Sequence, residues 1–179
     1  MFYENIPNQP PVNQVTSGNF GLLVAYLLPG FVALWGVAAY SETIQTWLAT
    51  GGSISPSIGG FLYLTLASLT AGLLVSTLRW AAVDRIHHAT GIRPPEWDFN
   101  RLRNSLPAIE LLIENYYRYY QFYANTAIAA AVAYGAWRTT CCFGSGALDF
   151  AFVAVECLLL FGSRDTLRKY YRGVDQLTR

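Results

Sequence analysis

Three long stretches of the sequence contain no Asp, Glu, Lys, Arg or His: Asn5–Ser41, Thr43–Leu78 and Tyr119–Trp137. Each is long enough for a helix that crosses about 30 Å of hydrocarbon, which takes roughly 20 apolar residues. Only 13% of all residues are charged, whereas 53% are hydrophobic. Because a soluble domain of this size carries more charge on its surface, we predict an all-α integral membrane protein.

The hydrophobic pattern predicts four transmembrane helices in one domain, which covers residues 19–179. Residues 1–18 are rich in Asn, Gln and Pro and contain no Lys or Arg. We therefore expect a mobile N-terminal segment there and not a signal peptide. The four spans are expected at about 19–40, 60–80, 121–137 and 146–162.

The distribution of basic residues supports the fourth span, although that span contains Asp149 and Glu156. With four spans, the N-terminus, the connection between the second and third spans, and the C-terminus lie on one side. Every Lys and Arg except Arg138 falls on that side. Because basic residues accumulate on the cytoplasmic side of membrane proteins, we predict a multi-pass protein of a cell inner membrane with both termini cytoplasmic.

The second, third and fourth helices are expected to continue into the cytoplasm. The helical pattern of the second span runs on to near Gly91, the third helix begins near Pro107, and the fourth ends near Tyr171. These extensions define a cytoplasmic annex at about 81–120 and a basic tail at 163–179. Within the membrane, Pro29 predicts a kink in the first span, and the small residues Ser68 and Gly72 predict a close helix contact.

The stretch ENYYRYYQFYAN, residues 114–125, combines aromatic and polar residues. At 100° per residue, most of its tyrosines take one face of a helix, and the opposite face holds a polar stripe. We name this set the polar stripe: Glu114, Arg118, Gln121 and Asn125. It is either a solvated surface beside an interfacial belt of tyrosines or the lining of a water-filled vestibule, in which case these residues are pore candidates.

Glu156 is the main candidate for chemistry inside the membrane, because a carboxylate there is costly unless it is paired or wet. It is either an ion- or proton-handling group or a buried group that fixes packing. Partners at similar depth are Asn125, Thr77 and Arg79. Asp149, near the outer end of the same span, is expected to pair with Arg138.

A second group of titratable residues lies in the cytoplasmic annex. Carboxylates and imidazoles on two facing helices can form a metal site or perform acid–base catalysis. The spacing lacks the motifs of known metal sites, so capping and surface charge explain these residues more simply. We expect neither a metal nor a cofactor. The group comprises Asp84, His87, His88, Glu110 and Glu114.

Arginines and a lysine on the cytoplasmic side are candidates for contact with anionic lipid or with a partner protein. No phosphate-binding loop accompanies them, and the net charge of +1 argues against nucleic acid as a partner. These residues are Arg93, Arg101, Arg103, Arg168, Lys169 and Arg172.

Three functions remain open at this level. The leading hypothesis is a non-enzymatic protein that self-assembles in the lipid bilayer as a small pore or membrane-perturbing effector, by architectural analogy with membrane effectors of bacterial defence and toxin systems. The second is a membrane anchor or sensor that recruits a soluble cytoplasmic protein. The third is a membrane-surface metalloenzyme that uses the titratable group of the annex.

Overall fold

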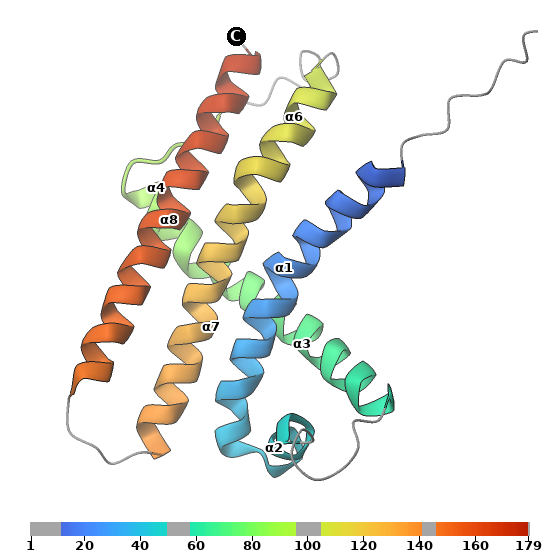
Figure 1. The fold of residues 1–179 in the computed structure, drawn as a ribbon. Helices are drawn as coiled ribbons and strands as arrows, with labels where there is room; N and C mark the ends of the chain where they lie inside the picture. Colours follow the sequence, from blue (N-terminus) through green and yellow to red (C-terminus); the bar gives the residue numbers. More distant parts are fainter. Residues whose placement is uncertain (1–11, 50–57, 96–104, 141–145, 179) are drawn as a thin grey trace, which may run out of the picture.

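The computed structural model describes residues 12–49, 58–95, 105–140 and 146–178, and within these ranges the chain is helical apart from short connections (Figure 1). The helices are α1 (Val12–Val37), α2 (Glu42–Ala49), α3 (Ile58–Arg79), α4 (Arg85–Ala89), α6 (Leu106–Leu112), α7 (Arg118–Thr140) and α8 (Ala147–Thr178). The short helical turns are η1 (Ala38–Tyr40), η2 (Trp80–Asp84) and η4 (Ile113–Tyr117).

Two of these helices continue through a π-helical turn without a break. The turn η2 joins α3 to α4, and η4 joins α6 to α7. The first of these helices ends at Ala89, and Gly91 follows with a φ of 96°, a conformation that favours glycine. The two helices therefore extend as far along the chain as predicted, to near Gly91 and from near Pro107.

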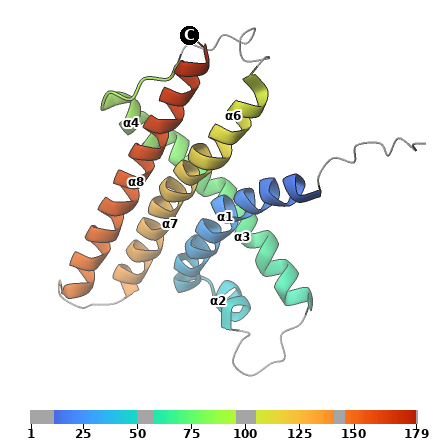
Figure 2. The same cartoon turned by 45° about the horizontal axis from the view of Figure 1, so that its top comes forward.

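The central element is α7, which packs against α1, α3 and α8. Figures 1 and 2 show α8 running beside α7, while α3 crosses behind α1 at a steep angle and its continuation toward α4 passes behind α8. The start of α1, α4, the start of α6 and the end of α8 lie toward one end of the molecule. The helix α2 and the start of α8 lie toward the other end (Figure 1). The helix α7 therefore lies inside the bundle.

Backbone contact between α1 and α3 occurs at two glycines. A Cβ atom added to Gly30 would overlap the backbone oxygen of Ser68, and one added to Gly72 would overlap that of Tyr26. Only glycine permits the two backbones to lie this close, because any side chain at either position would push the helices apart. The predicted close contact at Ser68 and Gly72 is therefore confirmed, and its partner is α1.

Two described helices are long and apolar enough to cross a membrane: Leu23–Tyr40 and Ile58–Ala89. Only 17% of the apolar window of the second is buried, which suits a helix surrounded by lipid better than the core helix of a soluble protein. Neither α7 nor α8 meets the same standard, because α7 is rich in Ala and polar residues, and α8 carries acidic residues and a charged tail.

The boundaries differ from the predictions in three places. The helix α1 begins at Val12, inside the segment 1–18 that we expected to be mobile. In the sequence it follows Pro10 and Pro11 directly, and proline is favoured at helix starts. The connection after the first span contains the helix α2, and α8 reaches Thr178, beyond the predicted end near Tyr171.

Candidate functional site

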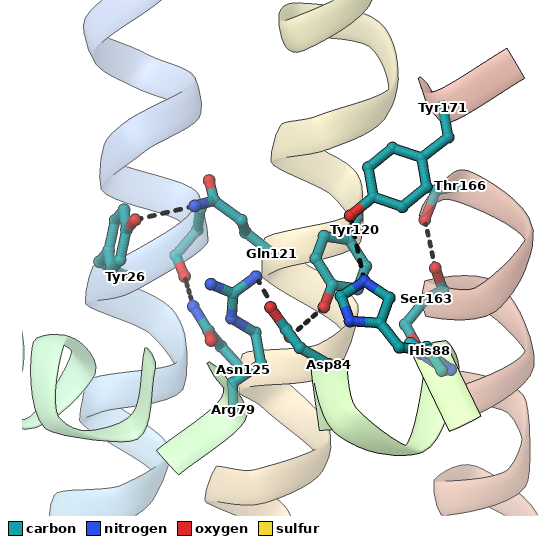
Figure 3. A network of polar contacts seen from close by, with 12 residues as sticks. Tyr26, Arg79, Asp84, His88, Tyr120, Gln121, Asn125, Ser163, Thr166 and Tyr171 are labelled. Atoms are coloured by element: carbon teal, nitrogen blue, oxygen red, sulfur yellow. Dashed lines mark hydrogen bonds and ion pairs between the residues drawn. The ribbon is translucent and has the colours of Figure 1, made fainter. Parts of the chain in front are cut away.

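Gln121 and Asn125, which we call the inner half of the polar stripe, face α1. The Gln121 amide nitrogen donates to the Tyr26 hydroxyl at 3.0 Å, and that of Asn125 donates to the Ala25 carbonyl at 2.9 Å (Figure 3). Gln121 is 8% exposed and Asn125 is fully buried. Within one copy of the chain these two amides therefore connect α7 to α1 and do not face water.

Asn125 has a structural role that involves Pro29. In a regular helix the N–H of residue 29 would donate to the carbonyl of residue 25, but proline has no N–H. The side chain of Asn125 supplies the missing donor to Ala25. In an apolar environment, a neighbouring helix is expected to satisfy a carbonyl freed by proline in this way.

The other two residues of the stripe are Glu114, in η4, and Arg118, the first residue of α7. Arg118 Nη1 is 3.6 Å from Glu114 Oε1. The Arg118 side chain extends across Gly21 of α1, where an added Cβ would lie 2.7 Å from Arg118 Cδ. All four residues of the stripe thus lie on the same side of the third predicted helix. Gly21, Ala25 and Tyr26 of α1 lie against that side.

Glu156 lies on the opposite side of α7, where α8 packs. Phe152 of α8 stacks on Tyr134 with ring centroids 3.8 Å apart, and Tyr170 lies 5.0 Å from the ring of Tyr117. Glu156 shares this face of α8 by helical spacing. The structure therefore does not place Glu156 on the side of α7 that carries the polar stripe.

One carboxylate oxygen of Glu156, Oε1, is buried and has no hydrogen-bond partner in the part of the chain that the structure describes. The partners that the sequence suggested bind elsewhere. Asn125 donates to Ala25, Thr77 donates to the Leu73 carbonyl at 3.1 Å, and Arg79 lies beside Asp84. Glu156 is consequently a half-buried acid with an unsatisfied oxygen in the middle of an apolar helical segment.

A buried polar network joins η2 and α3 to α7. The Tyr120 hydroxyl donates to Asp84, and Arg79 Nη1 lies 4.0 Å from the same carboxylate oxygen (Figure 3). The guanidinium carbon of Arg79 also lies 5.1 Å from the centre of the Tyr120 ring. Burial, and then the hydrogen bond to Asp84, raise the pKa of Tyr120, so the hydroxyl remains a donor.

Three further contacts hold α4 and the following turn against α8. His87 Nε2 lies 2.9 Å from Ser163 Oγ, His88 Nε2 lies 3.3 Å from the Tyr171 hydroxyl, and Arg164 donates to the Thr90 carbonyl at 2.7 Å. Burial raises the pKa of Tyr171 to about 12. The expectation that His87 provides surface charge is wrong, because it is only 4% exposed.

The titratable group of the annex does not form one cluster in the structure. Among the described residues, no group of three or more His, Cys, Asp or Glu side chains could hold a metal ion. Asp84 binds Tyr120 and Arg79, His87 binds Ser163, and Glu114 pairs with Arg118. Glu110 is exposed.

The predicted contact residues of the cytoplasmic side are exposed where the structure describes them: Arg93, Arg168, Lys169 and Arg172. Arg101 and Arg103 lie outside the described residues. At the other end, Arg138 Nη2 is 3.4 Å from Asp149 Oδ2, so the predicted pair is confirmed. Asp149 also accepts a hydrogen bond from Tyr134.

Several residues of these sites had no signal of their own in the sequence. Tyr26, Tyr120 and Ser163 are common residue types, and helical periodicity assigns them a face but no partner. Pro29 is the exception, because a proline in an apolar span implies a free carbonyl on the preceding turn, and a buried amide at similar depth is a natural donor.

Comparison of the chain with protein-family models, with curated proteins and with solved structures finds no match. The function is accordingly argued from the geometry of the described residues.

Proposed function

We propose that the chain is a non-enzymatic inner-membrane protein with four spans and cytoplasmic termini, which assembles with copies of itself and passes protons or small cations past Glu156. The observation that carries this proposal is the carboxylate oxygen of Glu156, which is buried and has no hydrogen-bond partner among the described residues. A carboxylic acid at membrane depth is expensive, and without a fixed partner it is free to exchange a proton or to bind a passing cation.

Self-assembly is supported by the apolar surface that one copy leaves uncovered. In α3 the buried residues form one stripe, Ser68, Gly72, Val75 and Arg79, and the rest of the helix is largely exposed. Large apolar side chains on α3 and α8 are more than half exposed, including Phe61, Leu66, Leu74, Phe150, Leu158 and Phe161. Lipid or further copies of the chain must cover these faces.

The proposed path runs along the seam between α7 and α8. It excludes the inner half of the polar stripe, since Gln121 and Asn125 are bonded to α1. Beyond Glu156 toward the cytoplasmic end, the same face of α8 carries Ser163 with its bond to His87. Polar groups therefore continue on that face beyond the acid.

The test is flux of protons and monovalent cations through liposomes that contain the purified protein. We expect Glu156→Gln to lower the flux by about tenfold or more, because the amide keeps the size of the acid but neither ionises nor binds a cation. Glu42→Gln, which removes an exposed carboxylate on α2, should leave the flux unchanged. Absence of flux in the wild-type protein under all conditions would reject ion passage, and a monomer in native lipid would reject assembly.

A second candidate function is a membrane anchor for a soluble protein, which the exposed basic end of α8 favours. Arg168, Lys169 and Arg172 lie within two helical turns of one another and are all exposed. Replacing all three with Glu should release a bound soluble partner and leave flux unaffected, whereas lipid contact alone predicts no change in copurifying protein.

A further inference from the structure

A pocket of about 340 Å³ separates the first half of α1 from the helix formed by η4 and α7. Its walls combine one carboxylate, one guanidinium and a group of aromatic rings. The residues that line it are Gly21 and Val24 of α1 and, across from them, Glu114, Asn115, Arg118, Tyr119, Phe122 and Tyr123. The pocket is therefore neither the apolar groove of a helix interface nor a purely charged surface.

The two charges are held in fixed positions. Arg118 lies against the bare backbone of Gly21, where an added Cβ would be 2.8 Å from Nη1. Its side chain is only 18% exposed, and Glu114, 3.6 Å away, is 39% exposed. A positive and a negative group thus stand side by side and both line the pocket.

Aromatic rings form another part of the wall. Tyr119 and Tyr123 lie with ring centroids 6.4 Å apart, and Phe122 lies 5.6 Å from Tyr123. The face of such a ring attracts an ammonium group within about 6 Å. Tyrosines of this kind are also typical of the depth at which lipid headgroups lie.

The position of the pocket agrees with that depth. It lies where the predicted cytoplasmic annex, residues 81–120, meets the third predicted span, residues 121–137. At that depth in the proposed arrangement the abundant ligands are lipid headgroups, and the two charges of the pocket suit a headgroup with one positive and one negative centre.

We propose that this pocket binds the headgroup of phosphatidylethanolamine, a zwitterionic phospholipid with a primary ammonium. The guanidinium of Arg118 is suited to the phosphate, and the carboxylate of Glu114 accepts hydrogen bonds from the ammonium. A choline headgroup lacks those hydrogen atoms. An anionic headgroup such as phosphatidylglycerol has no ammonium for Glu114 and brings its charge close to that carboxylate.

This proposal depends on the membrane location of the chain but not on self-assembly or ion passage. A protein that conducts no ions can still bind the lipid, and a conducting protein can lack lipid preference. The two proposals therefore fail in separate measurements.

The experiment is native mass spectrometry of the full chain, released from bilayers that contain equal amounts of phosphatidylethanolamine, phosphatidylcholine and phosphatidylglycerol. The wild-type protein should retain phosphatidylethanolamine in preference to both others. Glu114→Gln should lower that preference by about tenfold, the effect of one charge-assisted hydrogen bond, and should admit phosphatidylglycerol. Arg118→Gln should lower the retention of all three lipids, because each of them carries a phosphate.

Glu110→Gln is the matched control, because Glu110 is exposed on the preceding helical turn and does not line the pocket. Its lipid preference should equal that of the wild-type protein. The wild-type competition alone decides the matter if a variant fails to fold: equal retention of the three lipids, or a preference for phosphatidylglycerol or phosphatidylcholine, overturns the proposal.

Discussion

Two buried amides of α7, Gln121 and Asn125, donate to α1, and Asn125 shows why a single residue matters. It is fully buried, and its amide donates to Ala25, whose helical donor is missing because residue 29 is proline. A buried carbonyl without a partner costs about 1–3 kcal/mol. Pro29 and the amide of Asn125 therefore form one unit, although they are far apart in the sequence.

A double-mutant cycle tests this coupling. Asn125→Ala should lower the free energy of unfolding by about 1–3 kcal/mol, because it leaves the Ala25 carbonyl unsatisfied. Pro29→Ala restores the helical N–H, so the same Asn125→Ala change should cost less in that background. The measurement is reversible unfolding in mixed micelles, followed by circular dichroism.

Asn115→Ala is the control for the cycle, since Asn115 lies on the same continuous helix but is exposed. It should change stability by less than about 0.5 kcal/mol. Equal costs of Asn125→Ala with and without Pro29 would show that the two residues act independently.

The polar stripe also shows how far residue-level inference reaches. Its phase on the helix follows from the spacing of Glu114, Arg118, Gln121 and Asn125, and the structure keeps them on one side. Periodicity does not identify the neighbour, because nothing in the spacing distinguishes α1 from water or from a second copy. For Glu156, the sequence identified an unusual acid but suggested three partners that the structure uses elsewhere.

At the scale of elements, the crossing of α1 and α3 depends on two glycines. Gly30 and Gly72 allow each backbone to lie against the other, and no side chain separates them. At Gly135, on the central helix α7, an added Cβ would meet open space, since outside its own helix backbone no atom of the described residues lies within 4 Å. The chain thus offers the same substitution in a tight and in an open position.

Gly30→Ala and Gly72→Ala should each destabilise the protein by about 1–3 kcal/mol or more, because the added methyl group must push the helices apart. Gly135→Ala should instead stabilise it by roughly 0.5–1 kcal/mol, the usual gain of alanine over glycine within a helix. Thermal unfolding of the three variants gives the comparison. Stabilisation at all three positions would show that the crossing tolerates a side chain.

The elements themselves were predicted unevenly, for physical reasons. The long helices that continue beyond the apolar segments were predicted, since the amphipathic pattern runs through Asp84 and through Tyr117 without a breaker. The π-helical turns at these positions were not, because they depend on tertiary contacts such as that of Asp84 with Tyr120. The end of α8 was placed too early, since Gly173 and Asp175 resemble a helix end, although Gly173 packs against Leu112 of α6.

At the scale of the whole molecule, α4, the start of α6 and the end of α8 lie toward the same end (Figures 1 and 2). Arg85 belongs to α4, and Arg168, Lys169 and Arg172 belong to the second half of α8. The helix α8 has 32 residues, so at 1.5 Å per residue it is about 48 Å long. That length exceeds the roughly 30 Å of hydrocarbon and leaves a basic segment outside. The proposed orientation therefore requires α8 to cross the membrane despite Asp149 and Glu156.

Labelling of single cysteines tests that orientation. In a variant whose native cysteines are replaced by serine, cysteine is introduced at Gly146, Arg93 or Lys169, all of which are exposed. In right-side-out vesicles, a membrane-impermeant maleimide should react with the variant at Gly146 at once and with those at Arg93 and Lys169 only after permeabilisation. The expectation follows from the concentration of basic residues on the side of Arg93 and Lys169. Reaction at Gly146 and Lys169 from the same side would show that α8 does not span the bilayer, and the proposed path past Glu156 would then have no membrane to cross.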